Sequence, residues 1–487
     1  MLRKEKIIGG LSWSVLSKLS RQLLQLAIIF VLSRILSPAE FGLMSMVTAF
    51  SMLAEIVRNM GMGAAVIREK NEDRELLDTA FTFNLIVGII VFLLFFACAP
   101  LIAKFYKQHV LIELIRVFSV VYIIGAFNIV QEALLQKKME FKRLFFMDVS
   151  SVVISGIIAI TLAMRGFGVW SLVWQYISMI TISSFVLWIT SSWKPSVKFH
   201  ISTFRNFRKY SFSLFLHDLI YFVGRDADKF LVGKFAGPSA LGVYYRAFLL
   251  MLLPVNQVNI VIAKVMFPAL SSLQDNLAEM KKVYLRATNM ISYISFPSLA
   301  LMFIIAEPLI ILLLGREWVG TAVYLRIFCI YGMLESVGTT VYWIYKSVGR
   351  TGTMLKWGII STICTVLSVI TGLYLGGAKG VAISYVCVQL LLWIPGWKLA
   401  FKLVDLDFVT MLKNISPNFL TAVAGLLPAW LIYTQVSTFH PLNVVSIVSI
   451  SYIIAYLLFS AITKQPAYLF LHKMARNYWS IKFRKFS

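Results

Sequence analysis

The sequence is poor in charged residues, and above all in acidic ones. Its 487 residues include 22 Asp and Glu against 46 Lys and Arg, which gives a net charge of +24. Charged residues make up 14% of the chain, whereas soluble domains contain about 25%. A basic soluble protein would be expected to bind nucleic acid, but this composition, with 59% hydrophobic residues, is that of a membrane protein.

Cysteine is also scarce, and the chain has no glycine-rich motif of the kind that holds a nucleotide phosphate. The four cysteines lie in apolar segments with no spacing that suits a disulfide framework or a metal site, so we expect them to be packing residues: Cys98, Cys329, Cys364 and Cys387. We therefore expect no cofactor, and no ATP-driven transport by this chain alone.

Long apolar stretches fill most of the chain. A helix needs about 20 such residues to cross the hydrocarbon, and about fourteen segments qualify, which predicts an all-α membrane protein. The first has a basic start, but no cleavage site follows it, so we expect it to remain as the first helix. The predicted spans are 10–33, 41–65, 79–103, 110–135, 144–164, 168–190, 210–233, 239–266, 288–314, 319–345, 354–375, 380–401, 415–435 and 442–463.

The basic residues alternate from loop to loop. About thirty fall in one set of loops and about seven in the other, and the positive-inside rule places the richer set in the cytoplasm. Both termini are then expected to be cytoplasmic, and the number of crossings in this multi-pass membrane protein is expected to be even. The sparse loops hold Arg34, Lys104, Lys107, Arg165, Lys234, Arg316 and Lys379.

An internal repeat separates two halves of the chain by about 200 residues. Residues 37–43 (SPAEFGL) match residues 237–243 (GPSALGV), each after the first helix of a six-helix set. Six crossings give both lobes one orientation, as in transporters with parallel repeats. The predicted parts are an N-terminal lobe (1–190), a basic amphipathic linker on the membrane lipids (191–209), a C-terminal lobe (210–402), two further helices (403–463) and a basic cytoplasmic tail (464–487).

Ionisable residues inside the predicted helices are the main functional candidates, because they cost several kcal/mol unless they face a cavity or a partner. Lys18, Arg21, Gln22 and Gln25 recur at three- and four-residue spacing on one stripe of the first helix. No acid lies on that stripe, so we expect it to bind an anion. Diphosphate suits Lys and Arg.

Four further basic residues have a structural alternative. Arg225 and Lys229 share a helix face with Asp218, with His217 beside it, so this group either contributes to the anion site or forms ion pairs. Arg58 and Arg246 lie nearer the ends of their spans, where long side chains can also reach the interface. The intramembrane acids are candidates for coupling to H⁺ or Na⁺, or else counter-ions: Glu55, Glu132, Asp148, Asp218 and Glu335.

Short motifs in order along nearly the whole chain resemble the polysaccharide-export flippases of the multidrug/oligosaccharidyl-lipid/polysaccharide exporter superfamily. In the first half they are residues 34–42 (RILSPAEFG), 61–67 (GMGAAVI), 133–143 (ALLQKKMEFKR), 166–170 (GFGVW) and 228–234 (DKFLVGK). In the second half they are residues 314–318 (LGREW) and 348–351 (VGRT).

The resemblance implies a V-shaped, two-lobed transporter that flips polyprenyl-diphosphate-linked oligosaccharide from cytoplasm to periplasm for capsule, exopolysaccharide or O-antigen synthesis. It implies that basic residues in helices 1, 2 and 8 hold the diphosphate. Lys18, Arg21, Arg58 and Arg246 occupy the comparable helices. A polysaccharide polymerase and export machinery would be partners, and nucleic acid would not.

Two other functions compete with this one. A multidrug exporter of the same fold would favour an acidic or aromatic cavity, whereas the deep charges of the first helix are basic. A membrane enzyme of polysaccharide assembly would need a large outer loop or a group of catalytic carboxylates, and every outer loop here is short. The sequence therefore favours a transporter and not an enzyme.

Overall fold

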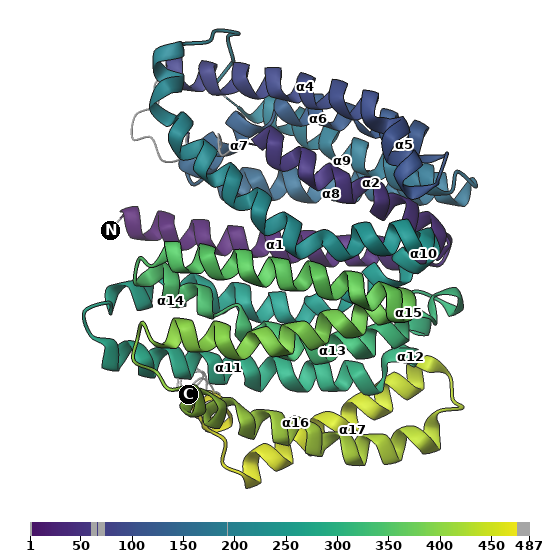
Figure 1. Ribbon diagram of the computed structural model, residues 1–487, viewed down its shortest axis with the longest axis vertical. Helices are drawn as coiled ribbons and strands as arrows, with labels where there is room; N and C mark the ends of the chain where they lie inside the picture. The colour runs from purple at the N-terminus through teal and green to yellow at the C-terminus, as the bar shows by residue number, and fades with distance from the viewer. Residues whose placement is uncertain (1, 60–65, 67–73, 192, 475–487) are drawn as a thin grey trace, which may run out of the picture. The chain divides into compact units, whose positions relative to one another are not determined.

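A computed structural model describes residues 2–59, 66, 74–191 and 193–474 of the chain (Figure 1). Its regular elements are all helices, and no strand occurs among these residues. The chain divides into two compact units, Met1–Gly242 and Val243–Ser487. Each unit is a bundle of long helices.

Eleven of the described helices are long and apolar enough to cross a membrane, or twelve if a bent pair counts as one span. The bent pair joins Leu111–Ala126 to Ile129–Lys137 at 42°. The expectation of an all-α, multi-pass membrane protein is confirmed. Fourteen crossings and the lobe boundaries given above stay predictions.

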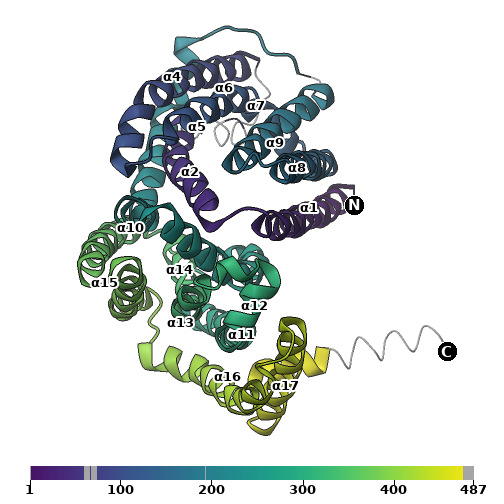
Figure 2. The same ribbon diagram turned by 90° about the vertical axis from the view of Figure 1, so that its right-hand side faces the viewer.

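The first unit is built around two groups of neighbouring helices (Figure 2). α8 packs on both α1 and α9, and α4 packs on α5 and α6. The described helices of this unit, the last of which continues into the second unit, are α1 (Leu2–Ser33), α2 (Pro38–Asn59), α4 (Arg74–Tyr106), α5 (Leu111–Phe118), α6 (Val120–Ala126), α7 (Ile129–Lys137), α8 (Phe141–Met164), α9 (Val169–Thr190) and α10 (Ile201–Ser272).

The repeat motif forms the start of α2. Pro38 is the first helical residue, where its missing N–H is no loss. Ser37 and Glu40 close a capping box: the Ser37 N–H donates to Glu40 Oε2 at 2.7 Å, and the Glu40 N–H donates to Ser37 Oγ at 3.4 Å. The local sequence therefore fixes where the chain turns back into the bilayer.

α10 is folded back on itself at Gly237, whose φ of 84° lies in the left-handed region. A Cβ at Gly233 would lie 3.2 Å from the Leu241 side chain, so the residues on either side of the turn pack together. Residues 193–200, before α10, form no helix or strand and are held on α4. There the Ser196 N–H donates to Asp78 Oδ1 at 3.1 Å, and the Thr82 hydroxyl donates to the Lys198 carbonyl at 3.0 Å.

The second unit ends in a helical hairpin that is fastened by buried amides. α16 and α17 lie side by side (Figure 2), and α16 packs on α11. The Asn418 amide donates to the Asn289 carbonyl at 3.0 Å and to Ser292 Oγ at 2.8 Å. The remaining elements are α11 (Leu277–Ile304), α12 (Ala306–Leu313), η1 (Arg316–Trp318), α13 (Thr321–Gly338), α14 (Val341–Ser347), α15 (Thr351–Phe401), α16 (Phe408–Val436) and α17 (Pro441–Ile462).

α15 also folds back, at Gly376 and Gly377, which both leave the helical conformation. The two halves contact each other away from the turn, because the Gln389 amide donates to Thr365 Oγ1 at 3.3 Å. α15 therefore comprises two antiparallel helices.

Candidate functional site

Five charged side chains of the first unit lie within electrostatic range of Glu132 or Tyr176, Glu132 itself included, and we call them the N-terminal charge cluster: Arg21, Glu55, Arg58, Glu132 and Asp148. They come from α1, α2, α7 and α8. All five were named from the sequence, Arg21 and Arg58 for substrate binding and the three acids for ion coupling or as counter-ions. The structure places them in one electrostatic neighbourhood, although they come from four helices.

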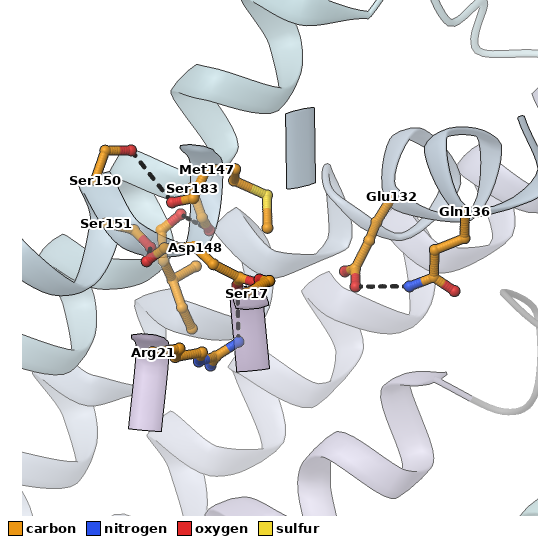
Figure 3. Close-up of polar contacts among 10 residues, drawn as sticks. Ser17, Arg21, Glu132, Gln136, Met147, Asp148, Ser150, Ser151 and Ser183 are labelled. Atoms are coloured by element: carbon orange, nitrogen blue, oxygen red, sulfur yellow. Dashed lines mark hydrogen bonds and ion pairs between the residues drawn. The ribbon is translucent and has the colours of Figure 1, made fainter. Parts of the chain in front are cut away.

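Arg21 forms an ion pair with Asp148 across the α1–α8 contact (Figure 3). Its Nη1 donates to Asp148 Oδ1 at 2.9 Å, and the Ser17 hydroxyl donates to Oδ2 of the same carboxylate at 2.7 Å. The expectation that the basic stripe of α1 is unpaired is therefore wrong for Arg21, because an acid 127 residues away supplies the partner. The ion pair is only partly buried, since 44% of the Arg21 side chain is exposed.

Lys18 lies one turn before Arg21 and is exposed. It makes no ion pair with any residue in the described part of the chain. Gln22 and Gln25 are half-buried on the same helix. α1 thus presents one exposed lysine and one partly exposed arginine within a membrane-length apolar helix.

Arg58 is buried in α2, with its guanidinium group against Gly125 of α6, where no side chain takes up the space. One turn earlier on α2, Glu55 accepts a hydrogen bond from the Tyr176 hydroxyl at 3.0 Å. Tyr176 lies within electrostatic range of Glu55, Arg58 and Arg21. This part of the cluster therefore links α2 to α9.

Glu132 lies on α7, after the bend in the broken span. One of its oxygens accepts a hydrogen bond from the Gln136 amide at 3.1 Å, as Figure 3 shows. The charges of Asp148, Arg21 and Arg58 act on this carboxylate. Glu132 is thus the member of the cluster on the bent helix.

The other predicted site residues lie elsewhere. Lys229 is buried in α10 and pairs with Asp226 on the same helix, which favours the structural alternative for this residue. In the second unit, Glu335 accepts a hydrogen bond from the Tyr331 hydroxyl at 2.8 Å, and Arg246 is half-buried. The side chains of His217, Asp218 and Arg225 lie outside the part of the chain that the structure describes.

The cluster combines two permanent cations with three carboxylates, so its carboxylates outnumber its guanidinium groups by one. Such a group inside an apolar bundle can bind an anion through the guanidinium groups, or take up a proton or a monovalent cation on the carboxylates. No set of three His, Cys, Asp or Glu side chains in the described residues is arranged to hold a metal ion.

Sequence reasoning named all five members of the cluster but did not pair them. Asp148 was a candidate for ion coupling or a counter-ion with no assigned partner, and Ser17, Gln136 and Tyr176 were not singled out. Ser17 lies four residues before Arg21, so the helical spacing could have indicated it. The pairing with Asp148 left no such local signal.

Known proteins match the chain over most of its length. A family model described as polysaccharide biosynthesis protein matches residues 31–323. The teichuronic acid biosynthesis protein TuaB of Bacillus subtilis is 25% identical over 431 residues, which cover 87% of this chain and 88% of TuaB. The succinoglycan biosynthesis transport protein ExoT of Rhizobium meliloti is 23% identical over 424 residues, which cover 87% of this chain and 85% of ExoT.

The fold is also similar to that of a solved transporter. The lipid II flippase MurJ, in an inward closed conformation, aligns with a TM-score of 0.76 at 16% sequence identity. The alignment covers 93% of this chain and 98% of that one. At this level of identity the likeness describes the fold.

Proposed function

The chain belongs to the polysaccharide biosynthesis protein family, and from this premise we propose that it is a flippase for a polyprenyl-diphosphate-linked oligosaccharide. It moves this lipid from the cytoplasmic to the periplasmic leaflet of the bacterial inner membrane, for capsule, exopolysaccharide or O-antigen synthesis. Both termini lie in the cytoplasm, and a polysaccharide polymerase and export machinery use the product.

The observation that carries the proposal is the partly exposed basic pair of α1. Lys18 is exposed and Arg21 keeps 44% of its side chain exposed, within a helix of membrane length. Charged groups at such depth are expensive unless they face a partner or a wet cavity. A diphosphate headgroup provides both the charge and the oxygen acceptors that these side chains bind. Arg58 and Arg246 complete the basic set that we assign to the headgroup.

Transport against a concentration difference needs an energy source, and we propose that it is H⁺ or Na⁺ entry. Glu55 and Glu132 in the first unit, and Asp218 and Glu335, are the carboxylates assigned to this step. Alternating access of the two lobes then exposes the headgroup site to each side in turn.

The test is the double variant Lys18→Ala and Arg21→Ala. We expect it to insert and fold, because neither residue packs an apolar core, and to lose polysaccharide export to the cell surface. Surface polysaccharide is measured with a specific lectin or antiserum in a strain that lacks the chromosomal copy. The lipid-linked precursor should accumulate in the cytoplasmic leaflet of the membrane.

The matched control is Lys104→Ala plus Lys107→Ala, which removes two basic residues at the end of α4 and beyond it. This control should export normally. Normal export by the Lys18/Arg21 double variant would contradict the assignment of the headgroup to α1.

A further inference from the structure

Asp148 is placed where an anionic substrate would have to compete with it. Its carboxylate contacts Arg21 through a single oxygen, Oδ1, while Oδ2 accepts from Ser17 (Figure 3). A guanidinium group has five N–H donors in a planar fork, so one contact leaves most of its hydrogen-bonding capacity for another anion. The exposed fraction of the two side chains, 44% for Arg21 and 18% for Asp148, leaves Arg21 as the more accessible partner.

We propose that Asp148 is a resident counter-ion that occupies Arg21 in the absence of substrate and competes with the diphosphate headgroup for it. The proposal rests on the flippase function above, and it adds a residue that sets how tightly the site binds the diphosphate headgroup. A transporter has to release what it binds, so a site must not hold its substrate too tightly. An internal carboxylate lowers the affinity of Arg21 for an anion and makes the empty site tolerable in an apolar helix.

The charges around Asp148 also act against a bound anion. Glu132 acts on the same region with a second negative charge, so the cluster already holds more carboxylates than guanidinium groups. An incoming anion is therefore opposed by like charge as well as by competition at Arg21. Removal of the Asp148 charge should relieve both effects.

We expect α1 to remain packed on α8 when the ion pair is removed, so an Asp148→Asn variant should fold. Trp13 contacts Phe145 with ring centroids 5.3 Å apart, and a Cβ on Gly156 would overlap the Ile28 side chain, so the two helices are in close contact on either side of Arg21. Asp148→Asn keeps the size of the side chain and an acceptor for Ser17. We therefore expect a folded protein with a normal size-exclusion profile.

The experiment measures binding of geranylgeranyl diphosphate to the purified full chain in detergent, by microscale thermophoresis. Asp148→Asn should bind the probe about fivefold more tightly than the parent, the change that corresponds to about 1 kcal/mol, the upper range for a partly exposed ion pair. Glu307→Gln, which removes the acid that faces Arg326 in the second unit, is the matched control and should bind as the parent does. Unchanged or weaker binding by Asp148→Asn would overturn the proposal.

A double-variant cycle separates competition at Arg21 from a general field effect. In an Arg21→Ala background the affinity for the probe should be lower than that of the parent, and Asp148→Asn should then give a clearly smaller gain, because only the like-charge effect is left to relieve. An equal gain in both backgrounds would contradict competition at Arg21. Ser17→Ala, which loosens the carboxylate and keeps both charges, should give a smaller gain in the same direction and provides a second route if Asp148→Asn folds poorly.

The outcomes also separate this proposal from the flippase function. If the parent protein does not bind the diphosphate probe at all, the headgroup assignment fails and this inference fails with it. If the parent binds, and Arg21→Ala weakens the binding while Asp148→Asn leaves it unchanged, the counter-ion role alone is wrong.

Discussion

At the scale of single residues, Gly125 decides where the Arg58 guanidinium group lies. A Cβ at this position would overlap Arg58 Nη1, so Gly125→Ala should push the guanidinium group out of its place beside α6. Because Nη1 is the far end of a flexible side chain, the cost should stay below the about 1–3 kcal/mol that is typical of overpacking, and thermal unfolding in detergent would measure it. We also expect export to fall, because Arg58 would no longer lie beside Glu55 and Tyr176.

Gly358→Ala is the control for this substitution, since no atom lies within 4 Å of a Cβ at that position in α15. The Gly358→Ala variant should therefore have the stability and the export of the parent protein. Arg58→Ala combined with Gly125→Ala should recover the stability and not the export. Normal export by Gly125→Ala alone would show that the position of Arg58 is not important for transport.

Local patterns in the sequence were sufficient to find the charged residues and insufficient to pair them. Lys18 and Arg21 stand out because a charge interrupts an apolar helix, and this signal needs only the residues of α1. The partner of Arg21 lies on α8, and a contact over 127 residues depends on how two helices pack. The positions of the charged residues within apolar helices were therefore predictable from the sequence, and their pairing was not.

At the scale of elements, the two copies of the repeated motif, residues 37–43 and 237–243, are in close contact with each other. A Cβ at Gly42 of α2 would overlap the Pro238 carbonyl, and a Cβ at Gly242 would overlap the Pro38 carbonyl. The two overlaps are reciprocal and involve backbone atoms, which cannot rotate away. Matching residues of the repeat thus approach each other where α2 and the second half of α10 begin.

Gly42→Ala and Gly242→Ala should therefore each lower the thermal unfolding temperature strongly, by an amount similar for both. Overpacking against backbone should exceed the roughly 1–3 kcal/mol that is typical of overpacking in a core. Gly352→Ala, at an open position in the first turn of α15, should have little effect. Equal melting temperatures for all three variants would mean that the two turns do not need this approach.

The elements also show what hydropathy can and cannot predict. The predicted spans 210–233 and 239–266 fall on the two halves of α10, and 354–375 and 380–401 fall on the two halves of α15, on either side of glycine breaks. The predicted span 110–135 is instead three short helices, α5 to α7, with a bend of 42°. Nothing in its apolar composition indicated that bend.

At the scale of the whole molecule, the distribution of basic residues predicts which ends of the helices face the cytoplasm. Cysteine labelling with a membrane-impermeant maleimide in intact cells is the direct measurement, after Cys387, the exposed native cysteine among the described residues, is replaced by Ala. His109 and His440 lie at exposed positions in loops that the charge pattern places outside. We expect cysteines at these two positions to react in intact cells.

Asp275 and Lys402 are equally exposed but lie in loops that the same pattern places in the cytoplasm. Cysteines there should react only after the membrane is permeabilised, because the reagent cannot reach them from outside. The four positions together test the orientation at several points along the chain, so a local error in one helix would reverse only the positions that follow it. If Asp275→Cys reacted in intact cells and His109→Cys did not, the true orientation would be the reverse of the predicted one. Lys18 of α1 would then lie on the side of the opposite leaflet.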